Sequence, residues 1–377
     1  MLDSALDPDE EALRSVARDF LRTAVPGAAS TVAAGEPREA GTAAGLSPVL
    51  WDSMAGLGWL GLGLPAEVGG GGAGLTTLCA LYGELGRALA PVPCLEVSVV
   101  AAETILRAGS AEQRAAILPE LAAGRLIVLP ALVDEDGSSL PAHPSVRARA
   151  CAAGGWVLSG TRPLVPFADS ADLLLVPATA TPAGTLFLVR TALPGVTITP
   201  APSMTGLPVS SVVLNNVQVG ADAVLGAPGQ AWEYLAPVIV RGKVLRCAEI
   251  AGAGDRVLEL VLAYARQREQ FGGPIGRYQA VQYLCTDLAM ATRVTQLLTA
   301  QAAWLLDQGE QSSARIAAGN AYGSAAARQI AHCAHEVFAG LGFMQEHDLH
   351  LFSRRLKYWE MDLGDASFHA GQLTAQL

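Results

Sequence analysis

Three hydrophobic patterns follow one another along the chain. Over residues 1–125 apolar side chains recur at helical spacing, as at Val16 and Phe20. Over residues 126–230 the pattern changes to short β-rich runs separated by Gly, Pro, Asn and Asp, which is typical of antiparallel strands. Helical spacing returns over residues 231–377. We therefore expect an α+β protein with an N-terminal helical domain, a middle antiparallel β domain and a C-terminal four-helix bundle, divided at these boundaries.

Several helix ends are marked by the sequence itself. Asp7 precedes Pro8 and is therefore the predicted N-cap of the first helix. Ser110 and Gln113 have the spacing of a capping box and predict the start of another helix. In the C-terminal region we expect four long helices: Val238 to Arg268, Arg277 to Asp307, Ser312 to Ala339, and His347 onward.

Composition limits the kinds of partner. Of the 377 residues 51% are hydrophobic and 16% are charged, so large apolar faces must be buried within the chain or against other subunits. The net charge is -10 and no extended Lys/Arg run occurs, which disfavours nucleic acid or an anionic membrane as a partner. We therefore expect small-molecule substrates and an oligomer.

Cysteine usage and the N-terminal stretch indicate the compartment. The six cysteines form no Cys-x-x-Cys pair, so neither a metal site nor a disulfide framework is predicted. The N-terminal stretch is acidic where a signal peptide would be basic, and no apolar run reaches the roughly 18 residues of a membrane span. We expect a cytoplasmic protein without a membrane segment.

Four segments in sequence carry a family resemblance. They are WDSMAGLGWLGLGLPAEVGG (Trp51 to Gly70), YGELGRALAPVP (Tyr82 to Pro93), RQREQFGGPIGRYQAVQ (Arg266 to Gln282) and FAGLGFMQEHDLHLFSRR (Phe338 to Arg355). Together they resemble the acyl-CoA dehydrogenases over essentially the whole chain. The resemblance implies a tetrameric flavoprotein in which a base removes the α proton of an acyl thioester, such as an acyl-CoA, and the β hydride passes to FAD.

The resemblance also assigns candidate cofactor residues. It implies that Arg268 and Phe271, with Gln270 between them, reach the pyrophosphate of an FAD held by the neighbouring subunit. Arginine suits this role because its planar fork of donors matches a diphosphate. The family's later Gln-x-x-Gly-Gly contact corresponds here to Glu336 and Gly340, so a carboxylate stands where an amide is usual.

The residues that would hold this chain's own flavin depart from the family. In VDEDGSSL, which replaces a Thr-Glu-Pro…Gly-Ser-Asp loop, Ser139 is the residue that clearly survives. Where a Trp and a Ser or Thr normally contact the isoalloxazine, the run GTRPLVPF offers Leu164, Val165 and Pro166. Proline has no N–H to donate.

The catalytic base is missing at both family positions. The resemblance places that glutamate at Leu363 or at Gly242, and neither residue can remove a proton. Four carboxylates lie nearby in sequence, and capping or solvent exposure is the favoured interpretation of the two closest, Asp362 and Glu249. The four are Glu249, Glu360, Asp362 and Asp365.

Three functions therefore stay open. The chain is an FAD-dependent acyl-CoA dehydrogenase whose base has moved, or it is a partner subunit of an α2β2 enzyme whose base comes from a second, related chain. The third hypothesis is a flavin monooxygenase on the same fold, which needs no base for a thioester. Missing bases favour the partner subunit, and similar paired enzymes act on bulky steroid or polyketide thioesters.

Overall fold

The structure, a computed structural model, describes most of the chain and groups it into two compact units. The described residues are 7–25, 45–138, 144–151, 154–180, 184–310 and 314–374. The first unit falls within residues 1–40, 74–90 and 243–377, and the second within 41–73 and 91–242. Both units are assembled from separate stretches of sequence, and the division into three consecutive domains stays a prediction.

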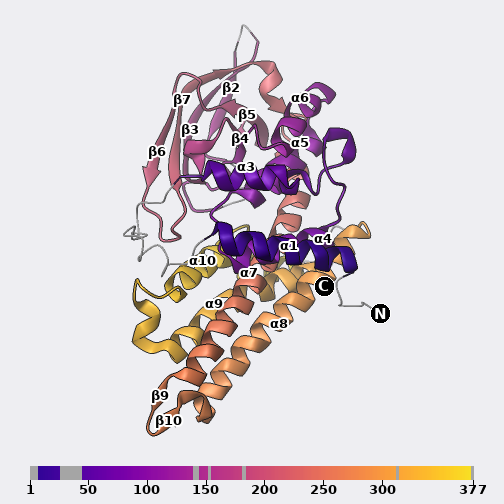
Figure 1. Cartoon of the computed structure of the whole chain (residues 1–377). Coiled ribbons are helices and arrows are strands. Elements are labelled where there is room, and N and C mark those ends of the chain that lie inside the picture. The colour runs from indigo at the N-terminus through magenta and orange to yellow at the C-terminus, as the bar shows by residue number, and fades with distance from the viewer. Residues whose placement is uncertain are drawn as a thin grey trace. The chain divides into compact units, whose positions relative to one another are not determined.

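The first unit is helical (Figure 1). Helix α7 (Ala231–Gln267) belongs to it from Lys243 onward. The other helices are α1 (Pro8–Ala24), α4 (Leu75–Arg87), α8 (Gln279–Asp307), α9 (Ala314–Phe338), α10 (Leu349–Met361) and α11 (Ala366–Thr374).

The core of the first unit is made by the apolar faces of α7 to α10. Ile250, Leu288, Ile330, Leu356 and Trp359 are among its buried members, and they come from all four helices. Their helical spacing in the sequence is what made these segments predictable. Three of the four expected long C-terminal helices are confirmed as α7, α8 and α9, whereas the fourth, expected from His347 onward, is divided into the shorter helices α10 and α11.

Helix ends in this unit follow local chemistry. The Asp7 side chain accepts from the Glu10 N–H and the Glu10 side chain accepts from the Asp7 N–H, so the predicted cap of α1 is present as a full capping box. Helix α4 starts at a glycine N-cap, and Asp307 takes over that role by accepting from the N–H groups of Leu75 and Thr76 at 2.7 and 3.0 Å.

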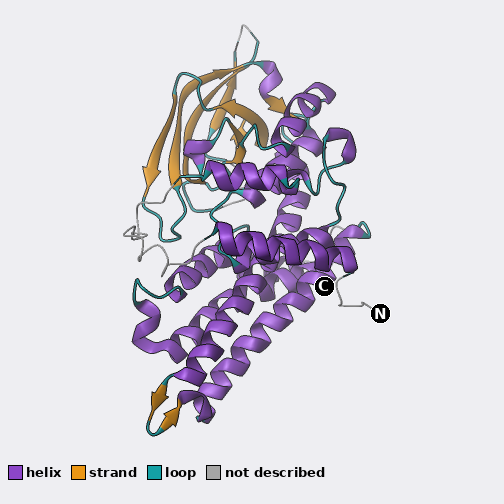
Figure 2. Ribbon diagram, in the orientation of Figure 1, coloured by secondary structure: helices purple, strands orange, loops and turns teal. Residues whose placement is uncertain are grey.

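The second unit combines short helices with a sheet, whose strands are orange in Figure 2. Its helices include α3 (Pro48–Gly56), α5 (Ala102–Ala108) and α6 (Ala111–Ala122), the last of which begins at the predicted Ser110–Gln113 capping box. The described strands are β1 (Val128–Pro130), β2 (Arg147–Ala150), β3 (Trp156–Pro166), β4 (Leu173–Thr179), β5 (Gly184–Arg190), β6 (Val196–Ala201), β7 (Val209–Val219) and β8 (Val224–Leu225).

The sheet has the order β6-β7-β3-β2-β4-β5-β8, with β1 paired to β4. Its ladders are antiparallel except for β1 with β4 and a single β2–β4 pair, so the sheet is mixed rather than purely antiparallel. The strands β4 and β5 are buried along almost their whole length. The expected α+β class is confirmed.

The start of the first C-terminal helix also differs from expectation. Helix α7 begins at Ala231 rather than Val238, and Pro237 lies inside the helix. A proline near the start of a long helix removes one N–H···O bond, and the remaining turns continue past it. Among the described helices, none is both long and apolar enough to span a bilayer.

Candidate functional site

The joint between α7 and α8 is a small hairpin held by its own side chains. Strands β9 (Glu269–Gln270) and β10 (Gly273–Pro274) pair antiparallel, and Figure 1 shows the hairpin beyond the ends of the two helices. Arg277 donates to the Gly272 and Phe271 carbonyls at 3.1 and 3.0 Å. The Tyr278 hydroxyl donates to the Gln270 carbonyl at 3.1 Å. The side chains of Arg277 and Tyr278 therefore hold the main chain of the turn in place.

The predicted cofactor residues on this hairpin point away from the chain. Arg268 donates its N–H to the Tyr264 carbonyl and accepts from the Ile275 N–H, both at 2.8 Å. In the described part of the chain its guanidinium has no hydrogen-bond or ion-pair partner, and it is exposed. Gln270 is exposed as well, and Phe271 is 87% exposed at a left-handed φ of 51°. The turn thus presents a free cation beside an exposed aromatic ring.

The end of α9 lies against the base of the hairpin. Phe338 stacks on Tyr264, with 4.5 Å between ring centroids. Beside it, Glu336 and Gly340 are both exposed. A Cβ at Gly340 would meet no other atom within 4 Å, so packing within the chain does not require glycine there. Glu336, near the end of α9, and Gly340, in the short 3-10 turn that follows it, therefore belong to the segment that packs on the end of α7, next to the hairpin.

The two family positions of the base sit beside a buried basic pair. Gly242 is buried in α7, and Leu363 is buried just past the end of α10 with a left-handed φ of 57°. The next residue along α7, Lys243, is fully buried, and its ammonium donates to the carbonyls of Trp359 and Asp362 at 3.1 and 2.8 Å. Lysine therefore ties α7 to the C-terminal end of α10.

The two closest carboxylates are taken by one arginine. Arg246 is 4% exposed and donates to Asp362 through Nε at 2.9 Å and Nη2 at 2.6 Å. It also donates to Glu249. Farther along, Glu360 pairs with Lys357 at 3.0 Å, and Asp365 accepts the Phe368 N–H at the start of α11. All four carboxylates near the expected base positions thus have partners.

Burial dominates the electrostatics of this centre. It lowers the pKa of the Lys243 ammonium and raises the pKa of the Cys247 thiol to about 11. Burial, reinforced by the charge of Lys243, lowers the pKa of His369 to about 4. A general base must be free to accept the proton and basic enough to hold it, and the pKa of His369, lowered to about 4, makes this imidazole a weak base. This centre offers paired carboxylates, a cation and a neutral imidazole.

The β3 residues that the resemblance assigns to this chain's own flavin offer few polar groups. Ser139 lies outside the described residues. Leu164 falls in a bulge of β3 and is 47% exposed, Val165 is fully buried, and Pro166 pairs with Val209 of β7 without an N–H to give. These three residues do not fit the hydrogen-bonding and stacking that an isoalloxazine ring requires, whereas the hairpin residues fit a diphosphate.

Lys243 and Arg246 are the residues that sequence reasoning missed. They sit in a helix that is apolar over most of its circumference, and both are buried. Such charges are almost never buried unless they are paired, so two cations in an apolar helix were the available signal. Apart from Glu249, which is three residues after Arg246, their partners lie 116 or more residues later in the chain, beyond the reach of a local pattern.

The chain was compared with known proteins. Family models for the acyl-CoA dehydrogenase N-terminal and C-terminal domains match residues 7–125 and 229–377. Acyl-CoA dehydrogenase FadE27 of Mycobacterium tuberculosis is 32% identical over 86% of this chain and 86% of its own length. Acyl-CoA dehydrogenase FadE34 of the same organism is 32% identical over 92% of this chain, which spans only 45% of FadE34.

Two solved structures extend the comparison. The ChsE4-ChsE5 complex from Mycobacterium tuberculosis superposes with a TM-score of 0.88 at 27% identity, covering 100% of this chain and 98% of that chain. A single-residue variant of the Tcur3481-Tcur3483 steroid ACAD gives a TM-score of 0.85 at 28% identity, covering 98% of each. Both are named for a pair of proteins.

Proposed function

Because this chain belongs to the acyl-CoA dehydrogenase family, whose members are flavoprotein oxidoreductases acting on CH–CH groups, we propose that it is the subunit without the base in an α2β2 dehydrogenase. The observation that carries the proposal is the centre around Lys243. Both family positions of the base lack a carboxylate, and the two nearest carboxylates, Asp362 and Glu249, are held by Arg246. The proton of the substrate is then removed by a glutamate of the second, related chain.

The hairpin supports a role in binding an FAD that is held mainly by the partner subunit. Bound FAD would accept the β hydride of the substrate. Arg268 would hold its pyrophosphate, since an exposed guanidinium without an internal partner is free to make charge-assisted hydrogen bonds. Phe271 and Gln270 would lie beside it. The open space over Gly340 permits the close approach of another molecule, and Glu336 would have to turn its carboxylate away or carry a proton.

The segment at Leu164 supports the other half of the proposal. A chain that lends contacts but has no donors for its own isoalloxazine depends on a partner that holds the flavin. Large apolar side chains near the hairpin are exposed as well, with Phe343 at 70% and Met344 at 52%, as expected for a surface covered by another subunit.

The names of the two paired complexes support a substrate class. One of them is a steroid dehydrogenase by its name, and the other is also a complex of two proteins. We infer that this chain takes part in the α,β-dehydrogenation of a bulky steroid or polyketide acyl thioester, such as an acyl-CoA, in the cytoplasm. In this enzyme the chain contributes Arg268 of the hairpin as a contact to FAD. The buried residues around Lys243 contribute packing and do not transfer a proton.

Flavin stoichiometry tests the proposal. The chain is purified alone and together with a related chain that retains the glutamate, and FAD absorbance is measured per protein. We expect about two FAD per four chains in the mixed tetramer and little flavin in the chain alone. One FAD per chain in active, isolated protein would instead establish a homotetrameric dehydrogenase. Oxygen consumption with reduced flavin, without thioester oxidation, would establish the monooxygenase.

A second measurement excludes a relocated base. Replacing Asp362 or Glu249 by its amide is expected to leave turnover of the mixed enzyme within about tenfold, equivalent to roughly 1.4 kcal/mol. A loss of several orders of magnitude would identify that carboxylate as the base and reject the partner-subunit role.

A further inference from the structure

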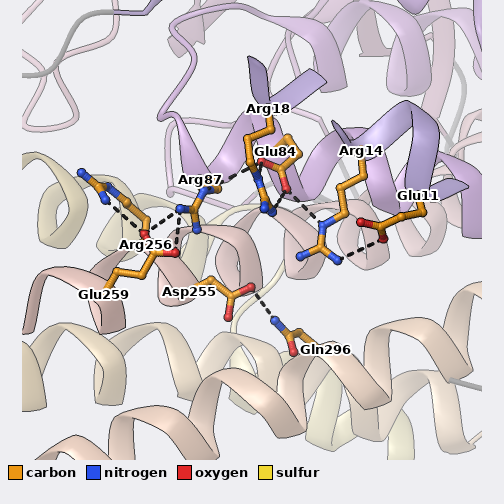
Figure 3. Close-up of polar contacts among 9 residues, drawn as sticks. All are labelled: Glu11, Arg14, Arg18, Glu84, Arg87, Asp255, Arg256, Glu259 and Gln296. Carbon is orange, nitrogen blue, oxygen red and sulfur yellow. Dashed lines mark hydrogen bonds and ion pairs between the residues drawn. The ribbon is translucent and has the colours of Figure 1, made fainter. Parts of the chain in front are cut away.

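The ionisable side chains of the first unit include two clusters of different chemistry. Between α1, α4 and α7, arginines and carboxylates neutralise one another. Glu84 accepts from Arg14 at 3.2 Å and from Arg18 at 2.6 Å, and Arg87 donates to Glu259 at 2.6 Å (Figure 3). The second cluster consists of histidines and lies where the chain passes from α9 to α10 (Figure 1). Histidine is the side chain whose charge changes close to neutral pH, so the second cluster is the one that responds there.

The chain passes from α9 to α10 through residues 339–348, which we call the connecting segment. In its middle the ring of Phe343 stacks on His335 of α9, with 4.3 Å between ring centroids. Near its end the ring of His347 packs on Phe338, the last residue of α9, with 4.4 Å between ring centroids. Two contacts between an imidazole and an aromatic ring therefore hold the connecting segment on α9.

The hydrogen bonds of His347 require a neutral imidazole. Its Nδ1 accepts the Leu349 N–H at 3.1 Å, at the start of α10, so this nitrogen carries no proton. Its main-chain carbonyl accepts from Nδ1 of His350 at 2.7 Å. A proton added to Nδ1 of His347 would face the Leu349 N–H and break that bond. Protonation of His347 therefore opposes the observed start of α10.

The environment of His335 also disfavours protonation. Its Nδ1 is buried and has no hydrogen-bond partner among the described residues. A Cβ at Gly342 would lie 2.9 Å from this nitrogen, so the connecting segment covers it. A proton there would make a buried N–H without an acceptor, which is unfavourable. An imidazolium would be attracted to the Phe343 ring, and this attraction offsets part of the penalty.

The charges around the two imidazoles give little compensation. Burial lowers the pKa of His335, and the charges of His350 and His347 lower it further. Burial also lowers the pKa of His347; the Asp348 carboxylate raises it and His350 lowers it. In the described part of the chain, three imidazoles thus act on one another with the Asp348 carboxylate beside them. Protonation would place like charges together.

We propose that His347 and His335 form a pH-sensitive switch, which holds the connecting segment on α9 while both imidazoles are neutral and releases it when they are protonated. In the released state the imidazoles are in water, with an ordinary pKa of about 6.5. Below that pH the released state binds more protons than the closed state, so release is favoured as pH falls. The closed state is at its most stable above it.

Release would have a consequence at the flavin contact. The connecting segment carries Gly340 and the exposed side chains of Phe343 and Met344. The inference that their release weakens FAD retention in the mixed tetramer rests on the proposed function. The switch itself concerns this chain alone.

Hydrogen exchange of main-chain amides tests the switch. The purified full-length chain, with its partner subunit where the two purify together, is compared at pH 7.5 and pH 5.5. Exchange is expressed as a protection factor, which removes the pH dependence of intrinsic exchange. We expect protection of the connecting segment to fall about tenfold or more at pH 5.5, since one histidine gives about tenfold over this range, whereas peptides of α8 keep theirs. Equal protection of the connecting segment at both pH values would overturn the proposal.

Three variants assign the effect to the imidazoles. His347→Asn does not titrate and keeps a side-chain oxygen that accepts a main-chain N–H two residues on. Combined with His335→Gln, it should reduce the pH-dependent loss of protection to within about twofold. His332→Asn, at an exposed position of the same helix, is the matched control and should retain the full loss. A full loss in the double variant would reject the switch. If the double variant does not fold, His347→Asn alone decides, and it should reduce the loss by about threefold or more.

Flavin release separates the switch from the proposed function. FAD lost on dilution of the mixed tetramer is measured at the same two pH values, in the parent and in the double variant. We expect a larger loss at pH 5.5 in the parent alone. Lower protection of the connecting segment with unchanged flavin release would support the switch and reject the flavin contact at Gly340. Unchanged protection would reject the switch whatever the flavin does.

Discussion

The hairpin after α7 and the centre around Lys243 belong to one unit, and they use polar side chains in opposite ways. At the hairpin the main chain is tied down by Arg277 and Tyr278, while Arg268 and Phe271 are left exposed. At the centre, Lys243 and Arg246 are buried and consume the available acceptors. The hairpin therefore keeps polar and aromatic groups free for contacts outside the chain, whereas the centre around Lys243 pairs its charges internally.

Removing the cation of the buried centre should have the largest effect. Arg246→Met leaves the half-buried Asp362 and the buried Glu249 without their shared partner, and we expect the free energy of unfolding to fall by about 3–5 kcal/mol. Urea denaturation measures the change. Arg256→Met is the matched control, since Arg256 is 40% exposed and its pair with Glu259 should contribute under about 1 kcal/mol. Equal effects in the two variants would show that the centre is not an electrostatic core.

The pH dependence of stability should report the same centre. His369 is 1% exposed, and burial followed by the charge of Lys243 lowers its pKa to about 4. The unfolded state, with an ordinary pKa near 6.5, then binds more protons between these two values, so this contribution is complete above pH 6.5 and is lost as pH falls toward 4. The contribution amounts to about 3 kcal/mol.

His369→Gln should remove this contribution, so that its unfolding free energy changes less between pH 7 and pH 4 than that of the parent. The measurement is a set of denaturant titrations across that range. Parallel pH profiles for the two proteins would mean that the imidazole is not titrating in a buried site.

Removing the Arg268 side chain from the hairpin should weaken FAD binding and leave the free energy of unfolding nearly unchanged. Arg268→Ala in the mixed tetramer should weaken FAD retention by about 1.5–3 kcal/mol, roughly ten- to a hundredfold, with little change in unfolding. Flavin released on dilution is measured by absorbance. Arg266→Ala, which removes another exposed arginine two residues earlier, is the control. Equal flavin loss in both would indicate a general charge effect rather than a clamp.

The change at Phe271 should have the smallest effect, and it distinguishes a role in chain stability from a role in flavin binding. Phe271 has a φ of 51° and is 87% exposed, so Phe271→Gly relieves backbone strain and should raise the unfolding free energy by about 0.5–1 kcal/mol. Flavin retention should fall in the same variant, because the exposed ring is lost. A variant that is less stable and keeps its flavin would show that the ring packs within this chain.

The sequence alone predicted most of the long helices and the caps of α1 and α6. Helical and strand spacing are set by contacts within a few residues, so α8 and the Asp7 cap could be predicted. The end of α7 before Arg268 agrees with Gly272, Gly273 and Pro274, which disfavour a continuing helix. Missing glutamates at Gly242 and Leu363 were equally visible once the resemblance supplied the positions.

Only the tertiary structure decided how the charges are used. The Lys243 ammonium donates to the main-chain carbonyl of Asp362, 119 residues later in the sequence. Arg246 donates to the carboxylate of the same residue, 116 residues later. The Gln296 amide donates to Asp255, which lies 41 residues earlier. A local pattern reports which face of a helix is buried, but the partner of a buried charge depends on which other helix packs there, and that is fixed by the fold of the whole unit.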